Sequence, residues 1–183
     1  MTNIAIAGQS QLVLIDVQVK LCDAMLATDM QAVSDNCGRL IQAANLLAVP
    51  VVVTEQYPQG LGATIPEIAQ YFGNTKPIAK TNFSAYADSA FKAKLQRDKS
   101  QIILAGMEAH ICVLQTACDL MAQGKQVMVV EDAIISRNAA NRSNAIARMA
   151  NAGAVITNTE SVLYEWLGDA KHASFKAIAK LIK

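Results

Sequence analysis

The sequence predicts an α/β protein, a three-layer α/β/α sandwich built on a parallel sheet of six strands. Two observations lead to this prediction. Short uninterrupted apolar runs, such as LVLI at 12–15, have the composition of strands that helices cover on both faces. These runs alternate with longer segments whose apolar residues recur at three- and four-residue steps. Such alternation implies right-handed strand–helix–strand crossovers and therefore a parallel sheet.

Length and composition are consistent with one domain, residues 1–183. The chain has 183 residues, of which 52% are hydrophobic and 17% are charged. A domain of this size buries roughly 70% of the surface of its unfolded chain, so it needs no disulfide or structural metal. We therefore expect a well-filled globular core.

In the first half of the chain, strands are expected at 12–15, 49–53 and 77–79, and helices at 31–47 and 88–96. The first strand ends at Asp16. Pro50 falls near the start of the second strand, where its missing N–H is tolerated. By position alone, Lys80 at the end of the third strand is expected to be a solvated surface lysine.

The segment 54–76 interrupts the alternation. It contains three glycines and the two prolines Pro58 and Pro66. A short helix is expected at 65–72. Loops of this length in compact domains are usually functional. Two interpretations stay open, a cover over a binding site and a subunit contact.

In the second half, strands are expected at 102–105, 126–130 and 154–156, and helices at 111–123, 138–150, 159–167 and 170–182. Gly106 is expected to break the fourth strand, and Gly124 to end the helix that follows. Glu131 and Asp132 are expected to open a loop after the fifth strand, and Thr159 to cap the helix at 159–167.

Charge, the length of apolar segments and cysteine content argue against several classes of protein. The net charge of +1 and the lack of any basic run argue against nucleic-acid binding. No apolar window is long enough to cross a membrane, and MTNIAIAGQS lacks the features of a signal peptide. The four cysteines have no paired CxxC spacing, which favours a reduced, cytoplasmic protein. Cys118 is expected to lie in the core.

Cys112 is expected in the first turn of the helix that follows the fourth strand. Free N–H groups and the helix dipole stabilise an anion there, which favours a reactive thiolate over a thiol. The same N–H groups could hold the oxyanion that forms when a carbonyl is attacked. The alternative is that Cys112 is a small buried hydrophobic residue.

Asp16, Lys80 and Cys112 all fall at strand or turn ends on one edge of the predicted sheet, where open α/β sheets bind their ligands. Together they suggest a triad in which Asp16 is the general base and Lys80 holds its carboxylate. Histidine is the usual base for a cysteine nucleophile, but His110 and His172 are poorly placed for that role.

Three segments, LVLIDVQ, KTNFSAY and AGMEAHICVLQTACDL, give the chain a resemblance to the isochorismatase-like cysteine hydrolases over nearly its whole length. The resemblance implies a Rossmann-like fold, the triad Asp16, Lys80 and Cys112, and no cofactor. It also implies a cis peptide between Met107 and Glu108, with the N–H groups of Glu108 and Cys112 as oxyanion donors. A homo-oligomer is expected. No histidine follows the second strand as in nicotinamidases, so we expect no metal and no nicotinamidase activity.

The wall of the substrate pocket is expected to contain Gln18, Glu55, Tyr57, Phe83, Tyr86 and Glu108. Other roles stay open for several of these residues. Phe83 and Tyr86 could belong to the core or to a subunit interface, and Glu55 could stabilise its own loop.

The chemistry of these residues predicts a cofactor-independent hydrolase of a small amide that works through a covalent acyl-enzyme; an ester or a vinyl ether is a less favoured substrate. Two alternatives stay open. One is a non-catalytic oligomeric scaffold that keeps the fold, and the other is a thiol-redox protein.

Overall fold

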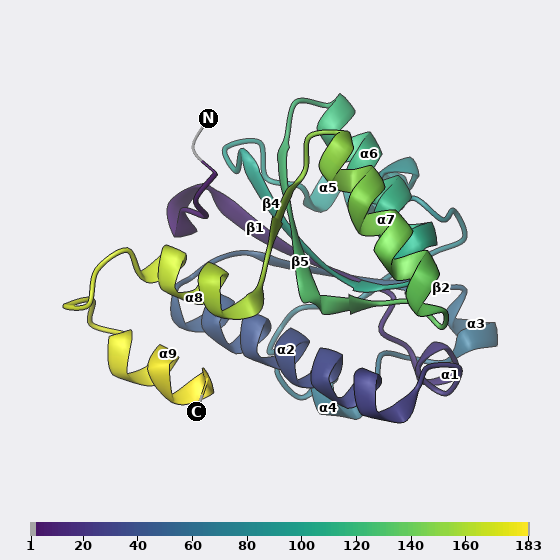
Figure 1. Ribbon diagram of the computed structural model, residues 1–183, viewed down its shortest axis with the longest axis horizontal. Coiled ribbons are helices and arrows are strands. Elements are labelled where there is room, and N and C mark those ends of the chain that lie inside the picture. Colours follow the sequence, from purple (N-terminus) through teal and green to yellow (C-terminus); the bar gives the residue numbers. More distant parts are fainter. Residues whose placement is uncertain (1–2, 183) are drawn as a thin grey trace.

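The computed structural model describes residues 3–182; Met1, Thr2 and Lys183 of the expected domain lie outside that range. Its centre is a sheet of six parallel strands in the order β3-β2-β1-β4-β5-β6 (Figure 1). The strands are β1 (Ser10–Ile15), β2 (Val51–Gln56), β3 (Ile78–Lys80), β4 (Gln101–Met107), β5 (Gln126–Ile135) and β6 (Val155–Thr157). The predicted fold class is confirmed.

Helices cover both faces of the sheet. One face carries α2 (Ala27–Leu46), α8 (Thr159–Leu167) and α9 (Phe175–Ile182), and the other carries α5 (Ser89–Lys94), α6 (Leu114–Ala122) and α7 (Ala139–Asn151) (Figure 1). The shorter elements are η1 (Ala7–Gln9), α1 (Val19–Cys22), α3 (Pro58–Leu61), α4 (Pro66–Ala69), η2 (Ala85–Ala87) and η3 (Ala109–Val113).

Strand β1 connects the two cores because it is buried along its whole length. Leu12 and Leu14 pack into the core beneath α2 and α8, whereas Val13 and Ile15 pack into the core beneath α6 and α7. This alternation follows from the two-residue period of a strand. Because β1 lies between β2 and β4, the residue that follows it emerges at the middle of the carboxyl edge of the sheet.

Several expected boundaries are wrong. Strand β2 begins after Pro50 and continues to Gln56, and β5 continues through Glu131 and Asp132 to Ile135. Asn158, not Thr159, caps α8: its side chain accepts a hydrogen bond from the backbone N–H of Ser161. Helix α9 begins at Phe175 rather than at 170. The segment 54–76 holds the end of β2 and two short helices, α3 and α4.

Gly106 does not end β4, contrary to expectation. It lies inside the strand with a φ of 115°, and a side chain there would place Cβ 2.1 Å from the backbone oxygen of Ile15. Glycine is therefore needed for a close approach of β4 to β1 at the strand end that leads into Asp16. The register between β4 and β5 also shifts at this point.

Candidate active site

Asp16 is fully buried at the carboxyl end of β1, with a left-handed φ of 52°. Both of its carboxylate oxygens are held by buried donors. Thr54 Oγ1 donates to Oδ1 at 2.7 Å, and Lys80 Nζ donates to Oδ2 at 2.7 Å. Thr54 was not singled out from the sequence, although it pairs with Ile15, the residue before Asp16. The carboxylate is thus fixed in one orientation.

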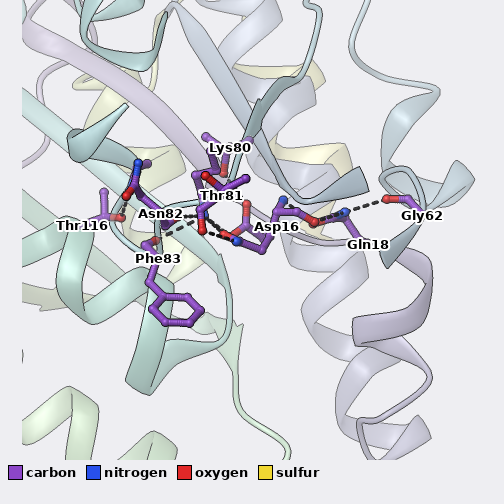
Figure 2. A network of polar contacts seen from close by, with 11 residues as sticks. Asp16, Gln18, Gly62, Lys80, Thr81, Asn82, Phe83 and Thr116 are labelled. Atoms are coloured by element: carbon purple, nitrogen blue, oxygen red, sulfur yellow. Dashed lines mark hydrogen bonds and ion pairs between the residues drawn. The ribbon is translucent and has the colours of Figure 1, made fainter. Parts of the chain in front are cut away.

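Lys80 is 2% exposed, so the expectation of a solvated surface lysine is wrong. Besides Asp16, its Nζ donates to Gln56 Oε1 at 2.7 Å and to the backbone oxygens of Asn82 and Phe83 at 3.1 and 3.2 Å. Figure 2 shows Lys80 between Asp16 and the Asn82–Phe83 backbone. A buried ammonium ion surrounded by oxygens is suited to stabilising a charge rather than to transferring a proton.

Cys112 lies in η3, a single π-helical turn that continues directly into α6. The side chain is 6% exposed. Burial raises the pKa of the Cys112 thiol to about 12, and the negative charge of the nearby Asp16 carboxylate acts in the same direction. Lys80 and the backbone N–H of Glu108 lower this pKa, but less strongly. The expected resting thiolate is therefore wrong, because desolvation outweighs the favourable field at the helix start.

The peptide bond between Met107 and Glu108 is cis, as expected from the resemblance. It joins the end of β4 to η3, and the backbone N–H of Glu108 donates towards the sulfur of Cys112. The chain thus brings Asp16, Lys80 and Cys112 together from three separate strand ends.

Gln18 and Glu55 hold the segment after β2 in place. The Gln18 side chain accepts from the backbone N–H of Gln56 at 2.6 Å and donates to the backbone oxygen of Gly62, also at 2.6 Å (Figure 2). Glu55 Oε1 accepts from the backbone N–H and the hydroxyl of Thr64 at 2.7 and 2.8 Å. These bonds fit the loop-stabilising role that was left open for Glu55 and extend that role to Gln18.

The expected aromatic residues separate into two groups. Tyr57 and Phe83 lie beside the site, since the Tyr57 N–H donates to the Lys80 backbone oxygen and the Phe83 backbone oxygen accepts from Lys80 Nζ. Their side chains are 55% and 56% exposed. Tyr86 instead packs against the core beneath α6, with Lys92 Nζ 4.9 Å from its ring centroid.

Three further observations concern metal ligands, membrane-spanning helices and Cys118. Within residues 3–182, no three His, Cys, Asp or Glu side chains gather closely enough to hold a metal ion. No helix in the same range is long and apolar enough to cross a membrane. Cys118, expected in the core, is exposed on α6 because it lies on the face of that helix opposite its buried residues.

Comparison with known proteins identifies relatives over most of the chain. The Isochorismatase domain model matches residues 10–161. Human isochorismatase domain-containing protein 2 is 42% identical over 176 residues, which cover 96% of this chain and 84% of the relative.

Two solved structures share the fold. The MAR1 ribonuclease of Caenorhabditis elegans superposes with a TM-score of 0.92 at 37% identity, covering 98% of this chain and 92% of that one. The YcaC gene product of Escherichia coli, described as an octameric hydrolase of unknown specificity, has a TM-score of 0.91 at 24% identity, covering 100% of this chain and 90% of that one.

Proposed function

The chain belongs to the isochorismatase-like hydrolase family, and within that family we propose that it hydrolyses a small amide through an acyl-enzyme on Cys112. The observation that carries this proposal is the proximity of the buried Cys112 thiol to a carboxylate that Lys80 and Thr54 hold in place. Such a constellation supplies a nucleophile, a base and a charge that stabilises the base.

In the first step Asp16 accepts the thiol proton as Sγ attacks the carbonyl carbon of the amide. Because the pKa of Cys112 is raised to about 12, proton transfer accompanies attack rather than preceding it. The oxyanion is stabilised by the backbone N–H groups of Glu108 and Cys112. The protonated Asp16 then gives its proton to the departing nitrogen as the C–N bond breaks, which leaves a thioester and releases ammonia or an amine.

In the second step Asp16 accepts a proton from water as the water oxygen attacks the thioester carbonyl. The carbon–sulfur bond breaks, the acid leaves, and the sulfur regains its proton from Asp16. One water is consumed for each amide cleaved. Lys80 stays an ammonium ion throughout, because its protons face oxygens of Asp16, Gln56, Asn82 and Phe83. The reaction uses no metal or cofactor, and an ester or vinyl ether is a less favoured substrate.

The proposal also covers the domain organisation, assembly, location and partners of the protein. Residues 1–183 form a single domain of a cytoplasmic homo-oligomer, without a nucleic-acid or membrane partner. The YcaC protein, which is described as octameric, supports the proposed oligomer only as a protein of the same fold. A non-catalytic scaffold is disfavoured because all three residues are present, with Lys80 paired to Asp16 and both close enough to influence the pKa of Cys112.

A second candidate, RNA cleavage, is raised by the name of the 37% identical Caenorhabditis elegans structure. A ribonuclease would need groups that hold a phosphodiester. The buried thiol and carboxylate of this site do not attack phosphorus readily, and the net charge of +1 gives little attraction to RNA. We therefore rank this candidate second.

The test is intact-protein mass spectrometry of the wild type and of Cys112→Ser after brief exposure to a panel of small amides, with product analysis of the same samples. We expect release of ammonia or amine and an acyl adduct on Cys112, both absent from the variant. Cys118→Ser, which changes an exposed thiol on the adjoining helix, should behave like the wild type. Turnover that survives Cys112→Ser would overturn the proposal, and cleavage of a model RNA that depends on Cys112 would favour the second candidate.

A further inference from the structure

A polar cluster that the proposed reaction does not use lies on the β5 side of Cys112. It consists of Glu108, His110, Ser136 and Arg137, and we call it the β5-side cluster. Met107 pairs with Ile135 at the ends of β4 and β5, so Glu108 and Ser136 leave the sheet side by side. The reaction uses only the backbone N–H of Glu108.

The carboxylate of Glu108 is buried and poorly supplied with donors. The residue is 5% exposed, and its Oε2 has no hydrogen-bond partner within residues 3–182. His110 Nδ1 lies 3.4 Å from Oε2 but is closer, at 3.0 Å, to the Ser136 hydroxyl. A buried carboxylate in such surroundings needs a cation. Arg137 supplies it, with Nε 3.0 Å from Oε1.

This ion pair leaves most of the guanidinium group available. The Arg137 side chain is 59% exposed, and within the described chain its two Nη atoms make no hydrogen bond. Lys80, by contrast, faces four oxygens and has no proton left for a ligand. A guanidinium group held at one nitrogen still presents a pair of donors that matches the geometry of a carboxylate.

We propose that Arg137 is the residue that recognises the substrate, and that the amide carries a carboxylate a few bonds from its scissile carbonyl. Asp16 and Lys80 lie near Cys112 at the ends of β1 and β3, whereas Arg137 follows β5 on the other side of β4 and pairs with Glu108, whose N–H faces the sulfur. A substrate over Cys112 would therefore have the base on one side and the exposed part of the Arg137 guanidinium group on the other. The nature of the scissile bond rests on the proposed function, but the recognition of negative charge can be tested without turnover.

The first experiment compares alkylation of Cys112 by iodoacetate and by iodoacetamide, two reagents of similar size that differ in charge. Peptide mass spectrometry gives the two rates at Cys112, with the exposed Cys118 as the internal reference in each sample. At low ionic strength, Arg137→Met should lower the iodoacetate-to-iodoacetamide ratio at Cys112 about tenfold. Arg137→Lys should keep part of the preference, and added salt should weaken it in the wild type.

Two controls separate recognition from a structural role. Arg148→Met changes another exposed arginine, on α7, and should leave the ratio unchanged. The double variant Glu108→Gln/Arg137→Met removes both members of the ion pair, so no buried charge is left unpaired. It should lose the preference as Arg137→Met does. An unchanged ratio in the double variant would overturn the proposal.

The second experiment measures hydrolysis of succinamate and of butyramide, a matched pair in which one member carries the carboxylate. The wild type should favour succinamate through a lower KM, and Arg137→Met should lose about tenfold in kcat/KM for succinamate alone. Equal losses for both amides would contradict recognition by Arg137. If neither amide is cleaved but the alkylation ratio still depends on Arg137, the proposed hydrolysis fails and the recognition of anions stands.

Discussion

At the scale of single residues, the orientation of Asp16 depends on two donors that come from different strands. Thr54 reaches one carboxylate oxygen from β2, and Lys80 reaches the other from β3. The left-handed backbone of Asp16, unusual for a residue other than glycine, turns its side chain off the axis of β1. Each donor removes one direction in which the carboxylate could rotate, which fixes the orientation that the proposed base needs.

Thr54→Val tests the contribution of the hydroxyl donor, because valine keeps the shape of threonine and loses only the hydrogen bond. A hydrogen bond to a buried charged group is worth about 1.5–3 kcal/mol, so kcat/KM on any cleaved amide should fall about 10- to 100-fold. Steady-state kinetics on the purified variant measure this. Thr157→Val in β6, where the Thr157 hydroxyl makes no hydrogen bond to any described residue, should leave kcat/KM unchanged; an equal loss there would show that the effect is not specific to Asp16.

Cys112 should react slowly with a thiol reagent in the absence of substrate. It is 6% exposed, and burial raises its pKa to about 12, so almost no thiolate is present near neutral pH. Time-resolved peptide mass spectrometry with iodoacetamide at pH 8 should find Cys118, which is exposed, labelled well before Cys112. Faster labelling of Cys112 would mean that the resting site holds a thiolate.

At the scale of elements, the sequence patterns predicted the strands better than their ends. Strands β1 and β4 were recognisable because an all-apolar run is typical of a buried parallel strand, and this placed Asp16 and Cys112 at one edge of the sheet. Strand β5 was cut short because Glu131 and Asp132 are polar. Yet the strand continues past them, and Asp132 accepts hydrogen bonds from the N–H and hydroxyl of Thr159 at the start of α8. Because Asp132 lies 27 positions before Thr159, this contact leaves no local signal in the sequence.

Residues that support the proposed site were missed for the same reason. Thr54 and Gln56 lie in a segment that the sequence indicated was a loop, whereas β2 continues through both residues. Arg137 has the local pattern of an ordinary exposed arginine, and only its contact with the buried Glu108 distinguishes it. Long-range pairing decides these roles, so residue type and spacing could indicate the proposed triad but not the residues that orient Asp16 and Lys80 or the partner of Glu108.

Gly106→Ala tests the close approach between β4 and β1. The new Cβ would lie 2.1 Å from the Ile15 oxygen at a φ of 115°, so the strands must separate at the residue that precedes Asp16. Overpacking and backbone strain together should cost about 2–5 kcal/mol of unfolding free energy. Urea unfolding followed by circular dichroism measures it, and the variant should also lose activity. Gly8→Ala, where the described residues beyond the local backbone place no atom within 4 Å of the new Cβ, should change stability by less than about 0.5 kcal/mol.

At the scale of the whole molecule, the two cores on either side of the sheet each enclose a thiol. Cys37 lies fully buried in the core beneath α2, and Cys112 borders the core beneath α6 and α7. Burial raises the pKa of Cys37 far above that of an ordinary thiol, and its Sγ lies 3.6 Å from the backbone oxygen of Ala133. The fold keeps both thiols neutral, so the free energy of unfolding is expected to change with pH in the alkaline range.

The sign of that dependence follows from proton binding in the folded and unfolded states. Above pH 9, the usual pKa of a cysteine in the unfolded chain, the unfolded state releases the Cys37 proton while the folded state retains it. The unfolded state then binds fewer protons, so the free energy of unfolding falls as pH rises. Stability from the neutral thiol is thus complete below pH 9 and is lost progressively above it.

Cys37→Ala should remove this part of the alkaline loss. The variant is expected to be about 1 kcal/mol less stable than the wild type at pH 7, because it leaves a small cavity. Between pH 9 and 11, the free energy of unfolding of the variant should fall less steeply with pH than that of the wild type. The two slopes should differ by up to about 1.4 kcal/mol per pH unit, so the curves of the two proteins converge and can cross. Urea unfolding at several pH values gives both curves, and groups that titrate in both proteins cancel in the difference. Val33→Ala, a neighbouring core truncation in α2 that removes no titratable group, should give a curve parallel to the wild type. Parallel curves for Cys37→Ala as well would mean that the Cys37 thiol ionises in the folded protein as readily as in the unfolded chain.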